Sequence, residues 1–159
     1  MGKINWVSSI VCFLILLSCS NMQPKETYNS NIKELNKILG LKFSGISANW
    51  IKVKLSADGN ENPFYIHALI SLNNNDTVII DSLKLNKDDI RNSISIDNKT
   101  FHRQIFEKVK KHCVKDSDGY YCFNVPVYST KWIIKNSLLT GYFVPLKRNL
   151  LFLTVSSDR

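Results

Sequence analysis

The fold depends most on residues 64–72, which read FYIHALISL. Apolar side chains recur at every second position, so one face carries Phe64, Ile66, Ala68, Ile70 and Leu72. A period of two predicts a β-strand with one buried face. The polar run 73–76 predicts a turn into a second strand at 77–83, and the two strands together predict a hairpin.

The residues before this stretch predict a helix and another strand. Ile32, Leu35, Ile38 and Leu39 lie on one helical stripe. Asn31 and Gly40 suit the two ends of that helix as N-cap and C-terminal glycine, and Glu34 completes a capping-box pattern with Asn31. The strand is expected at 49–55, where apolar residues alternate with Lys52 and Lys54.

The second half of the chain predicts one more helix and several strands. Phe101, Ile105, Val109 and Cys113 recur every four residues, which indicates a helix over about 99–114, capped by Asp97 or Asn98. The remaining apolar runs predict strands, with a short one at 93–96 and others at 120–125, 131–135, 138–146 and 150–156.

Length and composition indicate one folded domain. The chain has 159 residues, of which 44% are hydrophobic and 11% aromatic, and this content argues against disorder. We therefore expect an α+β fold at 31–159, with one antiparallel sheet of five to seven strands and two helices packed on one face.

The first 18 residues have the pattern of an export signal. Lys3 is followed by the apolar run 10–17, and the wider apolar segment 6–17 has twelve residues. A helix of that length reaches about 18 Å, whereas the hydrocarbon core of a bilayer is ~30 Å thick. The segment is thus expected to be a cleaved leader at 1–18 rather than a membrane span.

The end of this leader resembles the lipobox of bacterial lipoproteins. The resemblance rests on Leu16-Leu17-Ser18-Cys19, in which an aliphatic residue, a small residue and a cysteine stand in register. It implies that the Cys19 thiol receives diacylglycerol, that cleavage precedes Cys19, and that acyl chains such as palmitate anchor the protein in a membrane. In a Gram-negative host, Ser20 after this cysteine implies the outer rather than the inner membrane. An ordinary secretory signal with an incidental cysteine is the alternative.

Two consequences follow for the exported chain. Residues 19–30 are polar with little periodicity, so they are expected to form a flexible tether. Cys113 and Cys122 would lie in an oxidising compartment, where a helix end and the next strand bring them close, and we expect a disulfide between them. A metal site built from these cysteines with His102 and His112 matches no zinc spacing, so no metal or cofactor is expected.

The sequence contains no recognised catalytic motif. His67, His102 and His112 are scattered, and His67 is expected to be exposed or half-buried on its strand. The hydrolase, metalloprotease and nucleotide-binding signatures are absent from the sequence. We therefore expect a binding or inhibitor-type module rather than an enzyme. A small envelope hydrolase and a structural or assembly accessory remain open alternatives.

Positive charge is the feature that points to a partner. The chain has a formal net charge of +8, and Glu107 is the one acidic residue among six cations in 99–115. Lys108, Lys110 and Lys111 are the candidate contacts for an acidic envelope protein, lipid or glycan. Nucleic acid is not expected for an exported, membrane-anchored domain. A solvated helix face is the alternative explanation of this charge. A binding surface is further expected to expose Trp50, Tyr65 or Trp132.

Overall fold

The computed structural model describes residues 25–54, 63–83, 90–91, 95–96 and 101–157. The predicted leader, Cys19 and the first part of the predicted tether lie outside these residues, as do Asp97 and Asn98. The predicted tether was expected to continue through residue 30, but Lys25–Asn29 forms strand β1 and pairs with β2 along its whole length. The folded domain thus includes Lys25–Asn29, which the prediction assigned to the tether.

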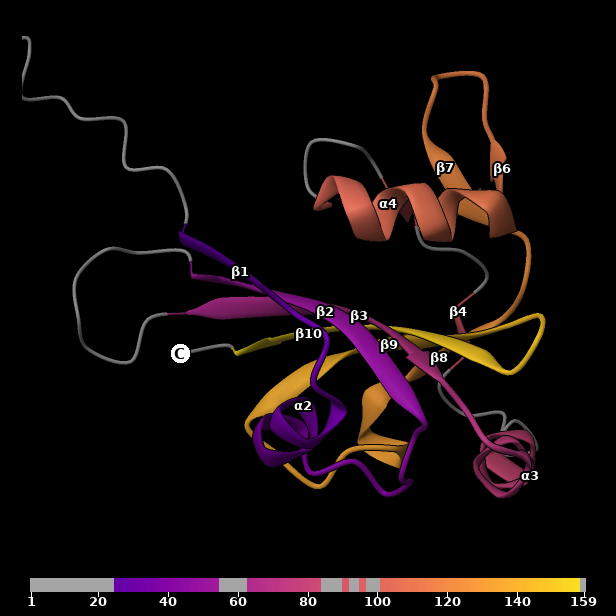
Figure 1. Ribbon diagram of the computed structural model, residues 1–159. Coiled ribbons are helices and arrows are strands. Elements are labelled where there is room, and N and C mark those ends of the chain that lie inside the picture. Colours follow the sequence, from indigo (N-terminus) through magenta and orange to yellow (C-terminus); the bar gives the residue numbers. More distant parts are fainter. Residues whose placement is uncertain (1–24, 55–62, 84–89, 92–94, 97–100, 158–159) are drawn as a thin grey trace, which may run out of the picture.

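The described residues form two antiparallel sheets and three α-helices, which confirms the α+β class (Figure 1). The large sheet has seven strands in the order β1-β2-β3-β10-β9-β8-β4, and the small sheet has the order β5-β7-β6. Besides β1, the strands are β2 (Ser47–Lys54), β3 (Phe64–Ser71), β4 (Ile90–Arg91), β5 (Ser95–Ile96), β6 (Cys113–Lys115), β7 (Tyr121–Phe123), β8 (Val127–Ser129), β9 (Leu139–Leu146) and β10 (Leu150–Ser157). The helices are α2 (Ile32–Leu39), α3 (Asn74–Leu83) and α4 (Arg103–Val109), with 3-10 turns η2 (Lys110–His112) and η3 (Thr130–Trp132).

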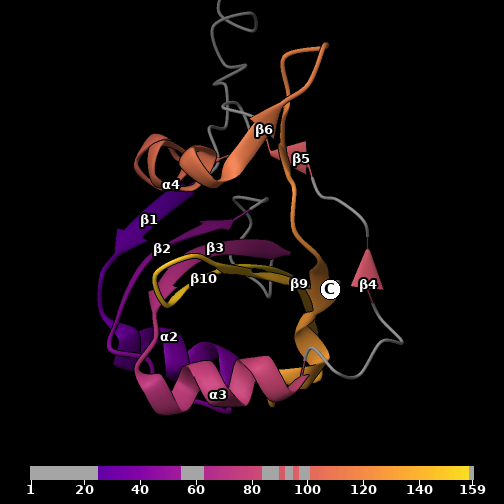
Figure 2. The same ribbon diagram turned by 90° about the vertical axis from the view of Figure 1, so that its right-hand side faces the viewer.

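The helices cover both faces of the large sheet, whereas the sequence predicted two helices on one face. Figure 2 shows α2 and α3 below the sheet and α4, with the small sheet, above it. The reason lies in the central strands, which are apolar on both sides: in β2, Trp50 packs into the core below while Ile51 and Val53 pack into the core above. Each face therefore needs its own cover.

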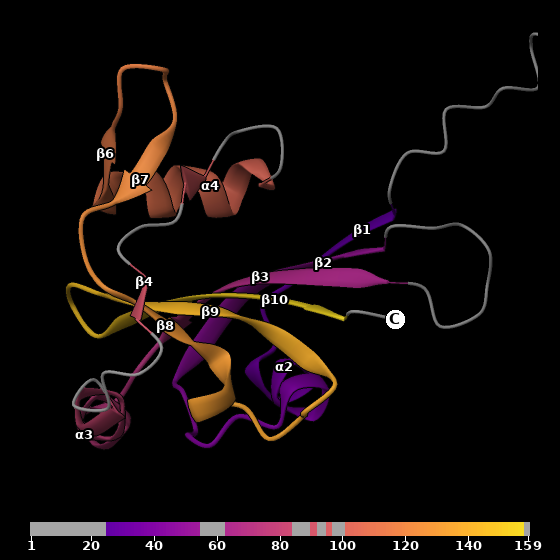
Figure 3. The ribbon, with the colours of Figure 1, turned by 180° about the vertical axis from the view of Figure 1, so that it is seen from behind.

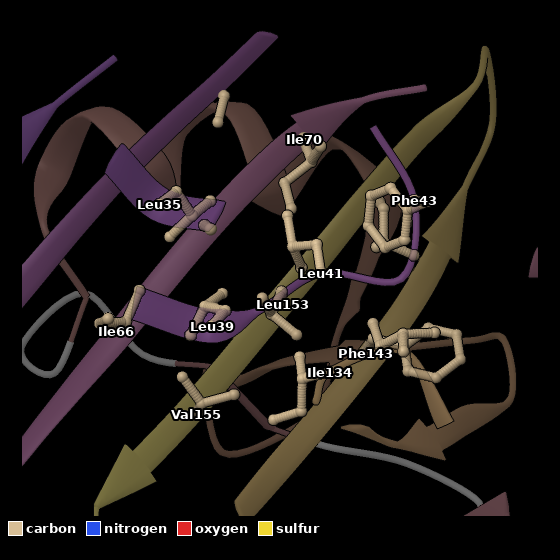
Figure 4. Close-up of a cluster of buried hydrophobic side chains, with 14 of the residues drawn as sticks. Leu35, Leu39, Leu41, Phe43, Ile66, Ile70, Ile134, Phe143, Leu153 and Val155 are labelled. Atoms are coloured by element: carbon tan, nitrogen blue, oxygen red, sulfur yellow. The ribbon is translucent and has the colours of Figure 1, made fainter. Parts of the chain in front are cut away.

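The core below the sheet is the larger one. It joins Leu35 and Leu39 of α2 with Ile66 and Ile70 of β3, and these side chains meet in Figure 4. Alternate residues of β10 complete it, among them Leu153. The predicted inward face of 64–72 is confirmed by this packing.

The core above the sheet is rich in aromatic rings. It contains Phe101, Phe106, Phe123 and Phe152, together with the buried side of α4. This core attaches the small sheet to the large one, because Phe123 of β7 stacks on Phe152 of β10 with ring centroids 5.4 Å apart.

Helix α2 forms as its sequence predicts. The Asn31 side chain accepts hydrogen bonds from the backbone N–H groups of Lys33 and Glu34, and Gly40 ends the helix with a φ of 62°. Only glycine adopts that left-handed conformation at low cost. The predicted capping box forms only in its Asn31 half, because the Asn31 N–H donates to the Asn29 side chain rather than to Glu34. The Glu34 carboxylate accepts a hydrogen bond from the Asn29 side-chain amide instead.

The predicted hairpin of 64–83 is wrong in its second half, since residues 74–83 form helix α3. Asn73 accepts a hydrogen bond from the Asp76 backbone N–H at 2.8 Å, and the Asp76 carboxylate accepts one from the Asn73 N–H at 3.4 Å. This reciprocal cap starts a helix where a turn was expected. The neighbours of β3 are instead β2 and β10.

Two other predicted elements differ from the structure. The second helix is shorter than 99–114: α4 covers Arg103–Val109, His102 caps it, and Cys113 already belongs to β6. The predicted strand at 131–135 does not form: its first two residues belong to the turn η3, and its strand-like contact is one bridge between Ile134 and Leu41. The strands β9 and β10 and the turn between them form as predicted.

Candidate basic surface

Helix α4 is fixed to the sheet by one apolar side and presents its cations on the other. Ile105, Phe106 and Val109 are buried in the upper core. Lys108 and Lys111 are exposed. The predicted candidate Lys110 differs from these two, because its ammonium group lies 2.7 Å from the Glu107 carboxylate and over the Phe106 ring. Its charge is therefore largely compensated within the helix.

The turn between β9 and β10 adds cations that lie far away in the sequence. Lys147 and Arg148 are exposed on this turn, and the Asn149 carbonyl accepts a hydrogen bond from the Leu72 N–H at 2.8 Å. Figures 1 and 3 place the turn on the same side of the molecule as the end of α4. The fold thus brings two separate positive segments to one side.

The pKa of His112 reflects the positive charges of both segments. Partial burial lowers the pKa of His112, and the positive charges of Arg148, Lys147 and Lys111 lower it further. A cation disfavours protonation of a neighbouring imidazole, so these three side chains act on the same site. We define the basic surface as Lys111, His112, Lys147 and Arg148. Sequence analysis found Lys111 but missed the other three as members of one site.

Removing one of these charges is expected to raise the pKa of His112. We predict that Lys147→Gln raises the His112 pKa, because one repulsive charge at the surface of the protein is lost. The measurement is an NMR titration of the His112 ring protons. Lys33→Gln, an exposed change on α2, is the matched control and should leave the titration where it is. Equal titration curves for Lys147→Gln and the unsubstituted protein would show that the charge of Lys147 does not act on His112.

The predicted disulfide does not form in the structure, where Cys113 and Cys122 are both free. Strand register explains this correction. Cys113 lies opposite Phe123, and Cys122 lies opposite Val114, so the two cysteines are offset by one residue. Successive side chains point to opposite faces of a strand, which directs the two thiols to opposite sides of the small sheet. Cys113 faces the upper core, and the Cys122 sulfur lies 3.3 Å from the Ser95 hydroxyl.

The two thiols are expected to react at different rates. Burial, followed by the proximity of Cys122, raises the pKa of Cys113 to about 12, so its reactive thiolate is scarce at neutral pH. We predict that iodoacetamide alkylates Cys122 at least tenfold faster than Cys113. Peptide mass spectrometry of the folded protein over time measures both rates. A protein in which neither thiol reacts until a reductant is added would show that the two are bonded after all.

The three histidines occupy separate places. His67 was expected to be exposed or half-buried, but it is 5% exposed within the upper core and stacks on Phe101 at 4.1 Å. His102 accepts a hydrogen bond from the Gln104 N–H and stacks on Tyr28. His112 belongs to the basic surface. Among the residues that the structure describes, no group of three or more His, Cys, Asp or Glu side chains is placed to hold a metal ion.

The aromatic residues proposed for a binding face are mostly covered. Trp50 is 4% exposed and donates its indole N–H to the Asn31 carbonyl at 3.1 Å, while Tyr65 and Trp132 are half-buried. Exposed apolar side chains occur elsewhere. Val114 in β6 is 56% exposed, and Tyr120, just before β7, is 49% exposed. Sequence alternation within such short strands was too brief to reveal them.

Comparison of the chain with protein-family models, with curated proteins and with solved structures finds no match. In the part of the chain that the structure describes, none of the helices has the length and apolar character needed to cross a membrane.

Proposed function

We propose that this protein is a bacterial cell-envelope lipoprotein whose domain acts by binding an acidic partner, without catalysis. The observation that carries the proposal is that the β9–β10 turn, with exposed Lys147 and Arg148, lies on the same side of the molecule as the end of α4, which exposed Lys111 follows (Figures 1 and 3). The lowered pKa of His112 agrees with this placement. Three cations held near one another repel, and this repulsion is relieved when a negatively charged partner binds. A site of this kind gains affinity from charge complementarity and needs no reacting group.

The place of action follows from the resemblance of the N-terminus to a lipoprotein leader. Lipid attached at Cys19 would anchor the mature chain at the envelope, and Ser20 favours the outer membrane in a Gram-negative host. The partner classes compatible with this location are an acidic envelope protein, an anionic lipid and an anionic glycan. A binding role suits each of them, and an immunity-type role suits the protein partner.

Charge reversal within the basic surface tests the proposal. The probe is fluorescent poly-L-glutamate, and its binding to the full-length protein is followed by anisotropy between about 50 and 300 mM salt. We expect Lys111→Glu/Lys147→Glu to weaken binding about tenfold or more at low salt and to flatten its salt dependence. The loss reflects two direct charge contacts replaced by repulsion.

The matched control is Lys33→Glu/Lys135→Glu, which changes the net charge equally. Lys33 and Lys135 are exposed on the side of the sheet that α2 covers. This control should change affinity by no more than about threefold, because it alters only the long-range field. If both double variants lost the same affinity for poly-L-glutamate, binding would depend on net charge alone. That result would contradict a localised site.

A further inference from the structure

One stretch of the chain supplies the layer above the large sheet. Its described residues, 95–96 and 101–123, contain β5, α4, η2, β6 and β7, and we call them the lid. Strands β4 and β8 flank the lid in the sequence and pair with each other, with Arg91 opposite Val127. The chain therefore leaves and rejoins the large sheet at one edge, and Figure 2 shows the lid above the central strands.

The lid is hydrogen-bonded to itself and packed against the sheet. Its three strands pair with one another, His102 caps α4, and the Asp116 carboxylate accepts a hydrogen bond from the Tyr120 N–H at 2.8 Å. Among the described residues, apolar and aromatic side chains join the lid to the sheet, as Phe123 does by stacking on Phe152. Separating the two parts would thus break packing and keep these hydrogen bonds.

The core below the large sheet is built without the lid. Its buried residues come from α2, α3, the long strands and the segments next to them, and none of those described belongs to the lid. A contiguous segment with its own hydrogen bonds is the kind of unit that opens while the rest of a domain stays folded. The larger core is therefore expected to hold the sheet together when the lid opens.

His67 lies at the boundary between the sheet and the lid. It belongs to β3, is 5% exposed, and stacks on Phe101 of the lid with ring centroids 4.1 Å apart. Neither of its ring nitrogens has a hydrogen-bond partner within the described part of the chain. Protonation would place an unpaired charge inside the upper core, and moving Phe101 away would expose that charge to water.

The closest neighbours of His67 on the sheet supply no negative charge. The Tyr65 ring lies 4.9 Å from it on the same strand. Burial raises the pKa of Tyr65, and the charge of Glu26 on β1 raises it further, so this phenol is neutral in acid. The remaining sheet residues that pair with or stack on His67 are uncharged, and they are Ile51, Phe152 and Thr154.

The lid likewise directs its described charges away from His67. Arg103, Glu107 and Lys108 are exposed on α4, whose buried side is apolar. His102 stacks on Tyr28 of β1 instead. The other titratable groups that border the upper core are a thiol and two phenols, which are uncharged in acid: Cys113, Tyr121 and Tyr142. No described group in contact with His67 is thus placed to compensate an imidazolium.

We propose that the lid opens from the large sheet as one unit when His67 is protonated, while the core below the sheet stays folded. The domain then carries an acid-triggered opening of its upper face. This inference does not depend on the function proposed above.

The direction of the response follows from proton binding. Burial lowers the pKa of His67 to about 4 with the lid closed, whereas an uncovered imidazole has its ordinary value of 6.5. Between these two pH values the open form is protonated and the closed form is mostly neutral, so a falling pH favours opening. A difference of this size makes the open form about 50-fold more populated at pH 4.5 than at pH 7.

Hydrogen exchange of the full-length protein, followed by mass spectrometry at pH 7 and pH 4.5, tests the proposal. Protection factors remove the intrinsic pH dependence of exchange. We expect α4, β6 and β7 to be at least about tenfold less protected than β3 and β10, and to lose about 50-fold in protection between the two pH values. Equal protection of lid and sheet at pH 4.5 would show that the domain opens only as a whole, and would overturn the proposal.

The variant His67→Phe tests the trigger. Its lid should keep its protection within about threefold between pH 7 and pH 4.5, because phenylalanine binds no proton. His112→Gln is the matched control, since His112 belongs to the lid but lies outside the upper core, and it should keep most of the acid response. A full loss of lid protection in His67→Phe would contradict His67 as the trigger.

Cys113 gives a second measurement that needs no substitution. Its side chain packs against the upper core, so a reagent reaches it when the lid opens. Dipyridyl disulfide modifies thiols in acid, and the rate at Cys113 is divided by its rate in the urea-unfolded protein at the same pH. We expect this ratio to rise about 50-fold from pH 7 to pH 4.5. A ratio that does not change with pH would overturn the acid-triggered opening.

Discussion

Acidification from pH 7 to pH 4 is expected to lower the free energy of unfolding by about 3 kcal/mol through His67 alone. Burial lowers the pKa of His67 to about 4 in the folded protein, whereas its ordinary value is 6.5. Between pH 6.5 and about 4, His67 is therefore protonated in the unfolded chain but mostly neutral in the folded domain. The contribution is complete above pH 6.5 and is lost progressively as the pH falls to about 4.

The surroundings of His67 explain the size of this effect. Its ring nitrogens have no hydrogen-bond partner among the described residues, and its ring lies beside Phe101, Phe152 and Tyr65. Across the neighbouring strands it is paired with Ile51 and Thr154. No group among these supplies a negative charge to an imidazolium, and a buried unpaired charge is costly.

The variant His67→Phe is expected to flatten the acid limb of the stability curve. Phenylalanine fits an aromatic cluster, removes two unpartnered polar atoms and cannot be protonated, so stability at pH 7 should be equal or higher. Urea unfolding at pH 7 and pH 4.5 measures both quantities. His112→Gln is the control, because His112 is half-buried and its change should leave most of the acid loss in place. An undiminished loss in His67→Phe would show that the pH dependence has another source.

The second large effect is expected at Asp76, where Asp76→Ala should cost about 3 kcal/mol or more of unfolding free energy. The Asp76 carboxylate is 3% exposed. It accepts hydrogen bonds from the backbone N–H groups of Ser44 at 3.1 Å, Gly45 at 3.0 Å and Asn73 at 3.4 Å. Alanine would leave these donors without their acceptor, and it would detach helix α3 from the loop before β2.

Two further variants make this prediction specific. Asp76→Asn keeps one oxygen acceptor in place and should lose about half as much stability as Asp76→Ala. Asn75→Ala, at the adjacent exposed position of the same helix, should change stability by less than about 0.5 kcal/mol. The midpoints of urea unfolding give the ranking, and a loss at Asn75 equal to that at Asp76 would assign the effect to helix propensity instead.

The elements predicted best from the sequence are those with a complete local signal. Helix α2 has Asn31 at its start and Gly40 at its end, β3 has apolar residues at every second position, and β10 begins with a continuous apolar run. Helix α3 was missed because Asn73 and Asp76 suit a turn as well as a helix cap, and the apolar run 78–80 fits either period. The tertiary hydrogen bonds that the Asp76 carboxylate accepts from the Ser44 and Gly45 N–H groups decide between the two, and the local sequence does not reveal them.

The same distinction holds for the candidate site. Lys111 was identified because it lies in a run of cations, whereas Lys147 and Arg148 join it only through the path of β9 and β10. The predicted disulfide between Cys113 and Cys122 depended on a detail of strand pairing that the sequence does not show. Their separation along the chain suits a disulfide, but a register offset of one residue directs the thiols to opposite faces of the small sheet.

The intact mass of the protein recovered from bacterial membranes tests the central proposal most directly. If the chain is an anchored lipoprotein, the purified product begins at Cys19 and carries the mass of a diacylglyceryl group there, with or without a further acyl chain. A Cys19→Ala variant would then leave the membrane fraction or keep its leader. Recovery of an unmodified chain that still contains residues 1–18, or of a soluble product without lipid, would contradict the anchor and the envelope location that follows from it.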